Sequence, residues 1–134
     1  MPDDASQKPV TTPADHSLIT ASRAIDTAIL NTQGERIGRL KDLSIDKISG
    51  QVRYALISFG GFLGVGDHIH PVPWSVLKYE PRLGGYVTPL DKAALEAAPK
   101  FSNDELAALG GGDHSFRETL FAYYSPYGAA PYWI

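Results

Sequence analysis

The chain has 134 residues, with twelve Lys and Arg against fifteen Asp and Glu, a net charge of -3 and no cysteine. This length suits one domain with one hydrophobic core. The lack of cysteine excludes disulfides, iron-sulfur ligation, thiolate zinc sites and a cysteine nucleophile, and the mildly acidic balance gives no general attraction to nucleic acid or anionic lipid.

Residues 1–17 are expected to form a flexible N-terminal tail. The first fifteen hold three prolines and no aromatic cluster, so they cannot bury enough surface to offset the entropy of ordering. They also lack the basic and apolar regions of a signal peptide, and no apolar run approaches the roughly 20 residues that a transmembrane helix needs. We therefore expect a cytoplasmic protein with no transmembrane segment.

From residue 18 onward, apolar residues recur at strand-like spacing between turn signals. Residues 28–30 form a short apolar run that leads into a turn ending at Gly34, which predicts a hairpin. The return segment, residues 36–46, has apolar residues at a spacing that is neither helical nor alternating. A bulged strand that shifts phase between Ile37 and Leu40 would explain this spacing.

The segment 51–59 alternates most clearly and predicts a central strand, because apolar residues occupy both of its faces. The segment 67–72 predicts the next strand. Pro71 and Pro73 should confine it to an edge, since proline cannot donate a ladder hydrogen bond. Between these strands, the glycine-rich loop 60–66 lacks the lysine and the following helix of a phosphate-binding loop, so it is interpreted as a structural turn.

The remainder of the chain predicts one more hairpin and then helices. Residues 77–80 and 86–88 are short strands around a Pro and Gly turn. Asp91 is a helix N-cap, and Pro99 ends that helix. Two S-x-x-E patterns, beginning at Ser102 and Ser115, match the capping box and predict two further short helices.

Several features of the sequence, taken together in chain order, resemble the PRC-barrel family. They are the segment 31–46, the turn at Gly50, the strand 51–59, the glycine-rich loop and the Pro73-Trp74 pair. The resemblance covers residues 18–90. It implies a small, strongly bent antiparallel β-barrel in a mainly β protein, with no catalytic residues and no cofactor. It also implies frequent self-association and a role as an adaptor or scaffold.

Within that family, the chain is similar to free-standing bacterial members. The reaction-centre and ribosome-maturation members have an additional membrane anchor or N-terminal domain, which we do not expect here. Residues 91–134 are expected to form a helical and aromatic C-terminal extension that packs on the barrel or on a second subunit.

His68 and His70 are the candidate metal ligands. Two residues apart on a strand, they would share one face and could bind a metal if an acidic side chain joined them. A partly exposed pair at a barrel edge is the plainer interpretation. Asp42 and Asp46 are similarly better explained as turn residues than as a catalytic pair.

Basic residues gather on one stretch, where five of the twelve lie within eighteen positions: Arg36, Arg39, Lys41, Lys47 and Arg53. This could be a surface that contacts an anion, including RNA. A solvated strand face is the simpler explanation, because acidic residues are interleaved and the overall charge is negative.

The C-terminal aromatic residues are the strongest candidates for a protein interface. Seven of the fourteen aromatic residues fall within the last nineteen positions, and such a segment will not stay free in water. It either folds over the barrel, crosses to a second subunit or anchors another protein. The interface candidates are Phe121, Tyr123, Tyr124, Tyr127, Tyr132 and Trp133.

The sequence thus predicts a non-enzymatic binding and assembly module that forms a homodimer and contacts a protein partner whose identity the sequence does not give. A ligand-sensing or metal-sensing module that uses His68 and His70 is one alternative. An RNA-associated or ribosome-associated assembly factor is another, although the charge balance does not favour nucleic acid.

Overall fold

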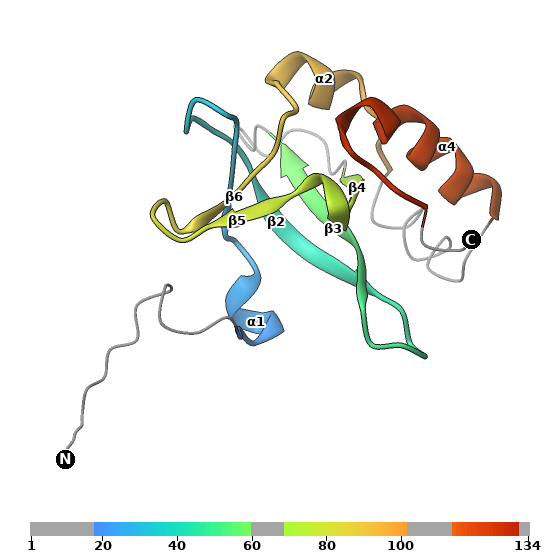
Figure 1. The fold of residues 1–134 in the computed structure, drawn as a ribbon, viewed down its shortest axis with the longest axis horizontal. Coiled ribbons are helices and arrows are strands. Elements are labelled where there is room, and N and C mark those ends of the chain that lie inside the picture. The colour runs from blue at the N-terminus through green and yellow to red at the C-terminus, as the bar shows by residue number, and fades with distance from the viewer. Residues whose placement is uncertain (1–17, 60–68, 102–113, 132–134) are drawn as a thin grey trace.

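The computed structural model describes residues 18–59, 69–101 and 114–131 (Figure 1). The predicted strand at 67–72 and the capping box at Ser102 therefore fall partly or wholly outside the described residues. In chain order the elements are α1 (Ala21–Ala24), β1 (Ala28–Leu30), β2 (Arg36–Ile45), β3 (Val52–Phe59), β4 (His70–Pro73), the 3-10 helix η2 (Trp74–Val76), β5 (Lys78–Glu80), β6 (Gly85–Val87), α2 (Lys92–Ala97), α4 (His114–Tyr124) and the 3-10 helix η3 (Ser125–Tyr127).

The described strands form one sheet in the order β4-β3-β2-β1-β6-β5. Neighbouring strands are antiparallel except for β1 and β6, which are parallel. The expected mainly β fold is confirmed, while the sheet is mixed rather than purely antiparallel. The parallel pair arises because β1 and β6 belong to different hairpins, and the edges of these hairpins meet in the middle of the sheet.

The strand β2 is bulged, as its apolar spacing predicts. Ile37 has no opposite residue in β1, because Leu30 pairs with Arg36 and Ile29 with Gly38. Lys41 likewise has no opposite residue in β3. The extra residues lie at the start of the predicted interval and just beyond its end, and they increase the local twist and bend of the strand.

The predicted positions of β3 and β4 are confirmed. Strand β3 lies between β2 and β4, and β4 is at an edge of the sheet, where its two prolines interrupt no ladder. Ala55 and Ile57 of β3 are wholly buried on one face. Tyr54, on the other face, packs edge-on against Phe121 of α4 with ring centroids 5.9 Å apart. Because both faces of β3 are apolar, each needs a layer packed against it, and α4 covers the face of Tyr54.

The sheet must curl, because its two outermost strands are joined by only four residues, 74–77. The extended chain from the end of β4 to the start of β5 spans at most about 18 Å. A flat sheet of six strands would place those outer strands roughly 24 Å apart. The connectivity therefore requires a bent sheet. Closure into the expected barrel stays a prediction, because β4 and β5 do not pair with each other within the described residues.

Aromatic packing holds residues 74–77, the connection between β4 and β5, against the end of the sheet formed by β6 and β5. Trp74 of η2 packs edge-on against Tyr86 of β6 with ring centroids 5.3 Å apart, and Tyr86 packs against Tyr79 of β5 at 5.2 Å. Burial raises the pKa of the Tyr86 hydroxyl, and the neighbouring Tyr79 adds to the increase. This row of rings bridges the two ends of the curled sheet.

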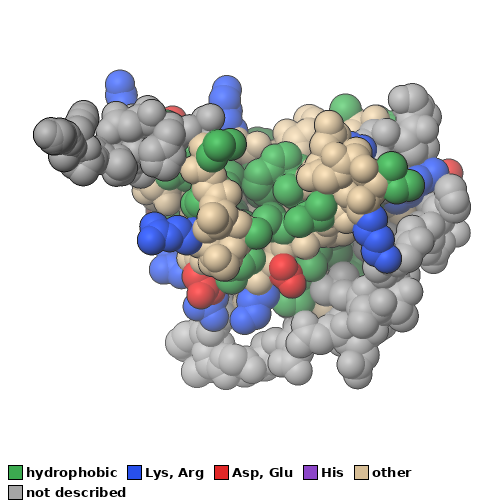
Figure 2. Space-filling view, turned by 90° about the horizontal axis from the view of Figure 1, so that it is seen from below, with side chains coloured by type: hydrophobic (Ala, Val, Ile, Leu, Met, Phe, Trp, Pro, Cys, Tyr) green, Lys and Arg blue, Asp and Glu red, His purple; other side chains and the backbone are tan. Residues whose placement is uncertain are grey.

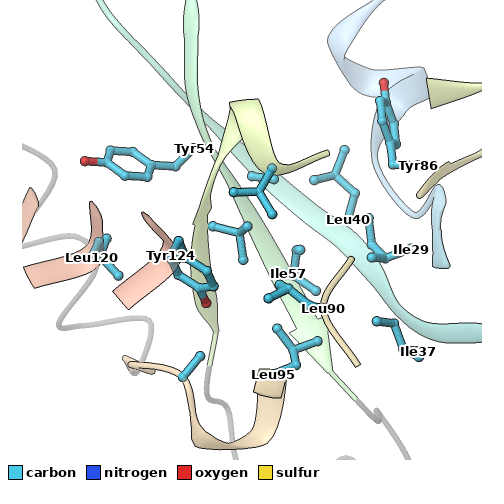
Figure 3. Close-up of a cluster of buried hydrophobic side chains, with 14 of the residues drawn as sticks. Ile29, Ile37, Leu40, Tyr54, Ile57, Tyr86, Leu90, Leu95, Leu120 and Tyr124 are labelled. Carbon is cyan, nitrogen blue, oxygen red and sulfur yellow. The ribbon is translucent and has the colours of Figure 1, made fainter. Parts of the chain in front are cut away.

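The core lies between the sheet and the C-terminal helices (Figure 3). Its wholly or almost wholly buried side chains include Ile29, Leu40, Ile57, Val72, Leu90, Leu95, Leu120 and Tyr124. Residues far apart in the sequence thus share one hydrophobic interior, as expected for a domain of this size.

The helix α2 forms where the sequence predicts it. Asp91 caps its N-terminus, and the Asp91 Oδ1 accepts the Ala94 N–H at 2.7 Å. The prediction for Ser115 is wrong in detail: α4 begins at His114, so Ser115 lies inside the helix rather than at its N-cap. The spacing of Ser and Glu in a capping box also occurs by chance within helices, and the four-residue pattern could not distinguish the two cases.

Candidate functional site

The aromatic candidates fall into two groups on α4 and η3. Phe121 and Tyr124 are buried in the core of this chain. Tyr123 and Tyr127 are only partly buried and pack against that core from outside. The remaining two candidates, Tyr132 and Trp133, lie outside the described residues. Of the candidates that the structure describes, the two partly buried tyrosines therefore keep ring surface available for a partner.

Three of these tyrosines pack together edge-on. The ring centroids of Tyr124 lie 5.0 Å from those of Tyr123 and 6.5 Å from those of Tyr127. The Tyr123 hydroxyl donates to the Ala94 carbonyl oxygen at 2.8 Å, which ties α4 to α2. Such geometry is favourable for aromatic pairs and restrains the exposed rings.

The hydroxyl of Tyr124 is a different case. It is buried and has no hydrogen-bond partner within the described part of the chain. Desolvation raises the pKa of Tyr124 strongly, and the neighbouring Tyr123 and Tyr127 add to the increase. Desolvation also raises the pKa of Tyr123, with smaller increases from Tyr127 and Asp91. Both hydroxyls therefore ionise at a higher pH than an exposed tyrosine does.

His70 is buried on the edge strand β4 and is only 4% exposed. It lies opposite Ile57 of β3, a residue of the core-facing side of the sheet. His68 lies outside the described residues, and those residues hold no group of three or more His, Cys, Asp or Glu side chains that could bind a metal. Metal binding by His68 and His70 stays a prediction.

The turn between β2 and β3 displays an apolar side chain that the sequence analysis did not identify. Ile48 is 98% exposed, and Ile45 at the end of β2 is 47% exposed. The turn is well fixed: Asp46 Oδ1 accepts the N–H groups of Ile48 at 2.8 Å and Ser49 at 3.1 Å. Gly50 closes it with a φ of 78° and donates its N–H to the Asp46 carbonyl oxygen at 2.8 Å. We refer to residues 45–50 as the hairpin tip.

Charge at the hairpin tip is partly neutralised. Arg53 Nη2 lies 3.5 Å from Asp46 Oδ2. The N–H groups of Ser49 and Ile48, with a smaller contribution from Arg53, lower the pKa of the Asp46 carboxyl. Lys47 is exposed and makes no ion pair within the described residues. The tip therefore presents an isoleucine beside a free positive charge, and Asp46 serves the structural role expected of a turn residue.

A groove lies at the other end of β2, between the β1–β2 turn and the β5–β6 turn. It has a volume of about 550 Å³ and is lined by Asn31, Thr32, Gly34, Glu80, Arg82, Leu83 and Val87. Leu83 is 54% exposed, which makes it the main apolar surface there. The Asn31 side chain is engaged within its own turn, where Oδ1 accepts the N–H groups of Gln33 and Glu35. The groove walls are thus fixed by the two turns.

The basic residues of β2 do not form one continuous unopposed surface. Arg39 Nε lies 3.7 Å from Asp26 Oδ1, and Arg53 pairs with Asp46. On the face shown in Figure 2, hydrophobic side chains gather in the middle with Lys and Arg around them and acidic side chains between. An apolar centre with a charged rim is the pattern of a protein interface. RNA binding stays a prediction that the observed pairing does not strengthen.

With this geometry established, comparison with protein families shows that residues 16–95 match the PRC-barrel domain. The chain belongs to the PRC-barrel family. The resemblance drawn from residues 18–90 is thereby confirmed. The family is generally non-catalytic, and its barrel is a general binding and assembly module. No curated protein matches the chain.

The PRC-barrel match extends from before α1 into α2, so the hairpin tip and the groove belong to the family domain. The aromatic surface of α4 and η3 lies beyond the matched residues. None of the helices in the described part of the chain has the length and apolar composition that crossing a bilayer requires. The expected cytoplasmic location stays a prediction.

Proposed function

We propose that this PRC-barrel chain is a non-enzymatic assembly module that forms a homodimer and contacts a protein partner through the aromatic residues of its C-terminal extension. The proposal rests on the different burial of the aromatic residues of α4 and η3. Phe121 and Tyr124 are buried in the core and fix the helix to the sheet, while Tyr123 and Tyr127 keep part of their rings at the surface.

Tyrosines held in this way are suited to a protein interface. A tyrosine ring offers a large contact area and has few rotatable bonds to order. The edge-on contacts of Tyr124 with both neighbours restrain those rings further. Binding would therefore cost little side-chain entropy, which favours affinity. Tyr132 and Trp133, which lie outside the described residues, stay candidates for the same interface.

The fold supports an assembly role for a further reason. A curled sheet with helices packed on it forms a rigid base, and rigid bases hold interface residues in place better than loops do. This role needs no metal and no cofactor.

The proposal is tested by light scattering and sedimentation over a concentration series from low to high micromolar. We expect the parent protein to approach the mass of a dimer, and Tyr127→Ala to shift the midpoint about tenfold higher in concentration, since interface tyrosines often dominate binding. Ile19→Ala is the control, because Ile19 is an exposed apolar residue just before α1, away from α4 and outside the row of packed rings.

Two results would count against the proposal. One is a monomeric parent protein throughout the series, which would exclude the homodimer. The other is an equal shift in both variants, which would show that the aromatic surface of α4 and η3 has no special part in self-association.

A further inference from the structure

The hairpin tip is organised for insertion into a concave surface. Ile48 is almost fully exposed, yet five hydrogen bonds hold the turn that carries it. Two go to the Asp46 carboxylate, one to the Asp46 carbonyl oxygen, one from the Asp46 N–H to the Gln51 carbonyl oxygen and one from the Gln51 N–H to the Ser49 Oγ. An apolar side chain on a fixed turn loses little entropy on docking. It also gains the most when a pocket removes it from water.

The groove offers a complementary surface. Its exposed apolar residue, Leu83, lies between the polar walls of two turns, and Val87 adds a second apolar side chain. The volume of about 550 Å³ is several times what an isoleucine side chain needs, so the neighbouring Lys47 could enter with it. Gly34 contributes no side chain to the wall, which leaves that side open to an approaching turn.

The tip and the groove cannot meet within one chain. The groove's β1–β2 turn directly precedes β2, and the hairpin tip directly follows it. The ten residues of β2 lie between the two, a span of up to about 33 Å at strand spacing. Figure 1 shows the two turns that form the groove at the opposite end of the molecule from the tip. Any contact between them must therefore join two copies of the chain.

Charge favours one orientation of this contact. Lys47 beside Ile48 is unpaired within the described residues, and Glu80 lines the groove. The Glu80 carboxylate accepts the Arg82 N–H through Oε2 at 3.2 Å, which uses one of its two oxygens. Arg82 also lines the groove, so an incoming Lys47 is attracted only on the side of Glu80. The apolar contact therefore supplies the affinity, and Lys47 with Glu80 sets the direction.

We propose that the hairpin tip of one copy, led by Ile48, binds in the groove beside Leu83 of a second copy. Such a contact is heterologous: it joins different surfaces of the two copies and leaves one tip and one groove free. It therefore builds chains or rings rather than a closed dimer. The contact is small, below the roughly 1,200 Å² of a standard interface, so the assembly is weak and depends on concentration.

This proposal extends the proposed self-association but uses a different surface from α4, and a mixing experiment distinguishes the two. Ile48→Asp should abolish binding by the hairpin tip and leave the groove intact. Leu83→Asp should abolish binding by the groove and leave the hairpin tip intact. Because the chain has no cysteine, a single Ser22→Cys substitution on α1 provides one labelling position. Circular dichroism and melting curves check that both variants fold, which is expected because both side chains are exposed.

Labelled Ile48→Asp protein is titrated with unlabelled Leu83→Asp protein, and fluorescence anisotropy reports complex formation. We expect a saturable increase in this mixture that exceeds the increase in Ile48→Asp with itself or Leu83→Asp with itself by about tenfold in apparent affinity. The α4 surface is intact in all three mixtures and contributes equally to each. A Lys47→Glu substitution should weaken the contact with the parent protein, and Glu80→Lys in the receiving copy should restore it.

Equal anisotropy increases in all three mixtures would overturn the head-to-tail contact and leave the α4 association standing. A flat response in every mixture would count against both. If the parent protein instead binds vesicles of phosphatidylcholine and phosphatidylserine while Ile48→Asp does not, and the three mixtures behave alike, the tip is a lipid-binding element and the proposal is wrong.

Discussion

Gly85 of β6 passes so close to Ala28 of β1 that a Cβ on Gly85 would lie 2.9 Å from the Ala28 carbonyl oxygen. The same Cβ would lie 3.1 Å from Leu30 Cδ1. Because the nearest atom belongs to the backbone of a paired strand, it cannot move aside without disturbing the parallel β1–β6 pair. We expect Gly85→Ala to lower the free energy of unfolding by about 1–3 kcal/mol, the usual cost of overpacking. Urea denaturation measures this loss.

The adjacent Gly84 is the matched control. A Cβ there would meet nothing within 4 Å, but its φ is 65°, a conformation that costs a non-glycine residue about 1–2 kcal/mol. Gly84→Ala should therefore be the milder substitution and should leave the sheet signal unchanged. A Gly85→Ala protein as stable as Gly84→Ala would show that β1 and β6 can separate at little cost.

The pairing of β1 with β6 also marks the limit of what the sequence could predict about the fold. Apolar alternation located the strands, since the period of two is local and strong in a segment such as β3. It carries no information on which strand edges meet, because 56 residues separate Ile29 from its partner Tyr86. The bulges of β2 were foreseen, but their positions depend on the partner strands and could not be read from the spacing alone.

For the candidate interaction surfaces too, the sequence predicted some features and missed others. Aromatic density predicted that the C-terminus is an interaction surface, and the i, i+3 and i+4 spacing of Leu120, Phe121 and Tyr124 could have indicated which rings share a buried helix face. The turn at Gly50 was predicted as well. The exposure of Ile48 was not, because turn propensity does not say which side chain the turn displays. The groove joins two turns that only the folded sheet brings together.

The two adjacent tyrosines of α4 should respond oppositely to removal of their hydroxyls. Tyr124 buries a hydroxyl with no partner in the described part of the chain, whereas the Tyr123 hydroxyl donates to the Ala94 carbonyl oxygen at 2.8 Å. We expect Tyr124→Phe to leave the free energy of unfolding unchanged or to raise it by up to about 1 kcal/mol, and Tyr123→Phe to lower it by about 0.5–1.5 kcal/mol. Denaturant titration of both proteins makes the comparison. A loss in Tyr124→Phe as large as that in Tyr123→Phe would mean that the Tyr124 hydroxyl is bonded after all.

Tyr124 should also make the protein sensitive to alkali. Burial raises the pKa of its hydroxyl far above the ordinary value near 10. Above about pH 10 the unfolded chain loses a proton that folded Tyr124 keeps, so its contribution to stability is full below that pH and declines as pH rises further. Unfolding free energies measured from pH 8 to 11.5 should fall less steeply for Tyr124→Phe than for the parent protein. Parallel curves would show that this hydroxyl ionises as readily in the folded chain as in the unfolded one.

At the opposite end of the pH range, the hairpin tip should weaken as Asp46 becomes protonated. The N–H groups of Ser49 and Ile48, and the nearby Arg53, stabilise its carboxylate and lower its pKa from 3.8. The folded state therefore gives up this proton more readily than the unfolded state, and the resulting stability is present above about pH 4 and is lost as pH falls through the lowered pKa. Asp46→Asn keeps an oxygen for the turn but removes the charge, so it should be less stable than the parent protein at pH 6 and approach it at pH 2.

Ser49→Ala is the control, because it removes the Ser49 Oγ that accepts the Gln51 N–H without changing any titrating group, and its effect should not vary with pH. If the deficit of Asp46→Asn is the same at pH 2 and pH 6, the charge of Asp46 does not stabilise the tip, and the fixed presentation of Ile48 must come from the backbone alone.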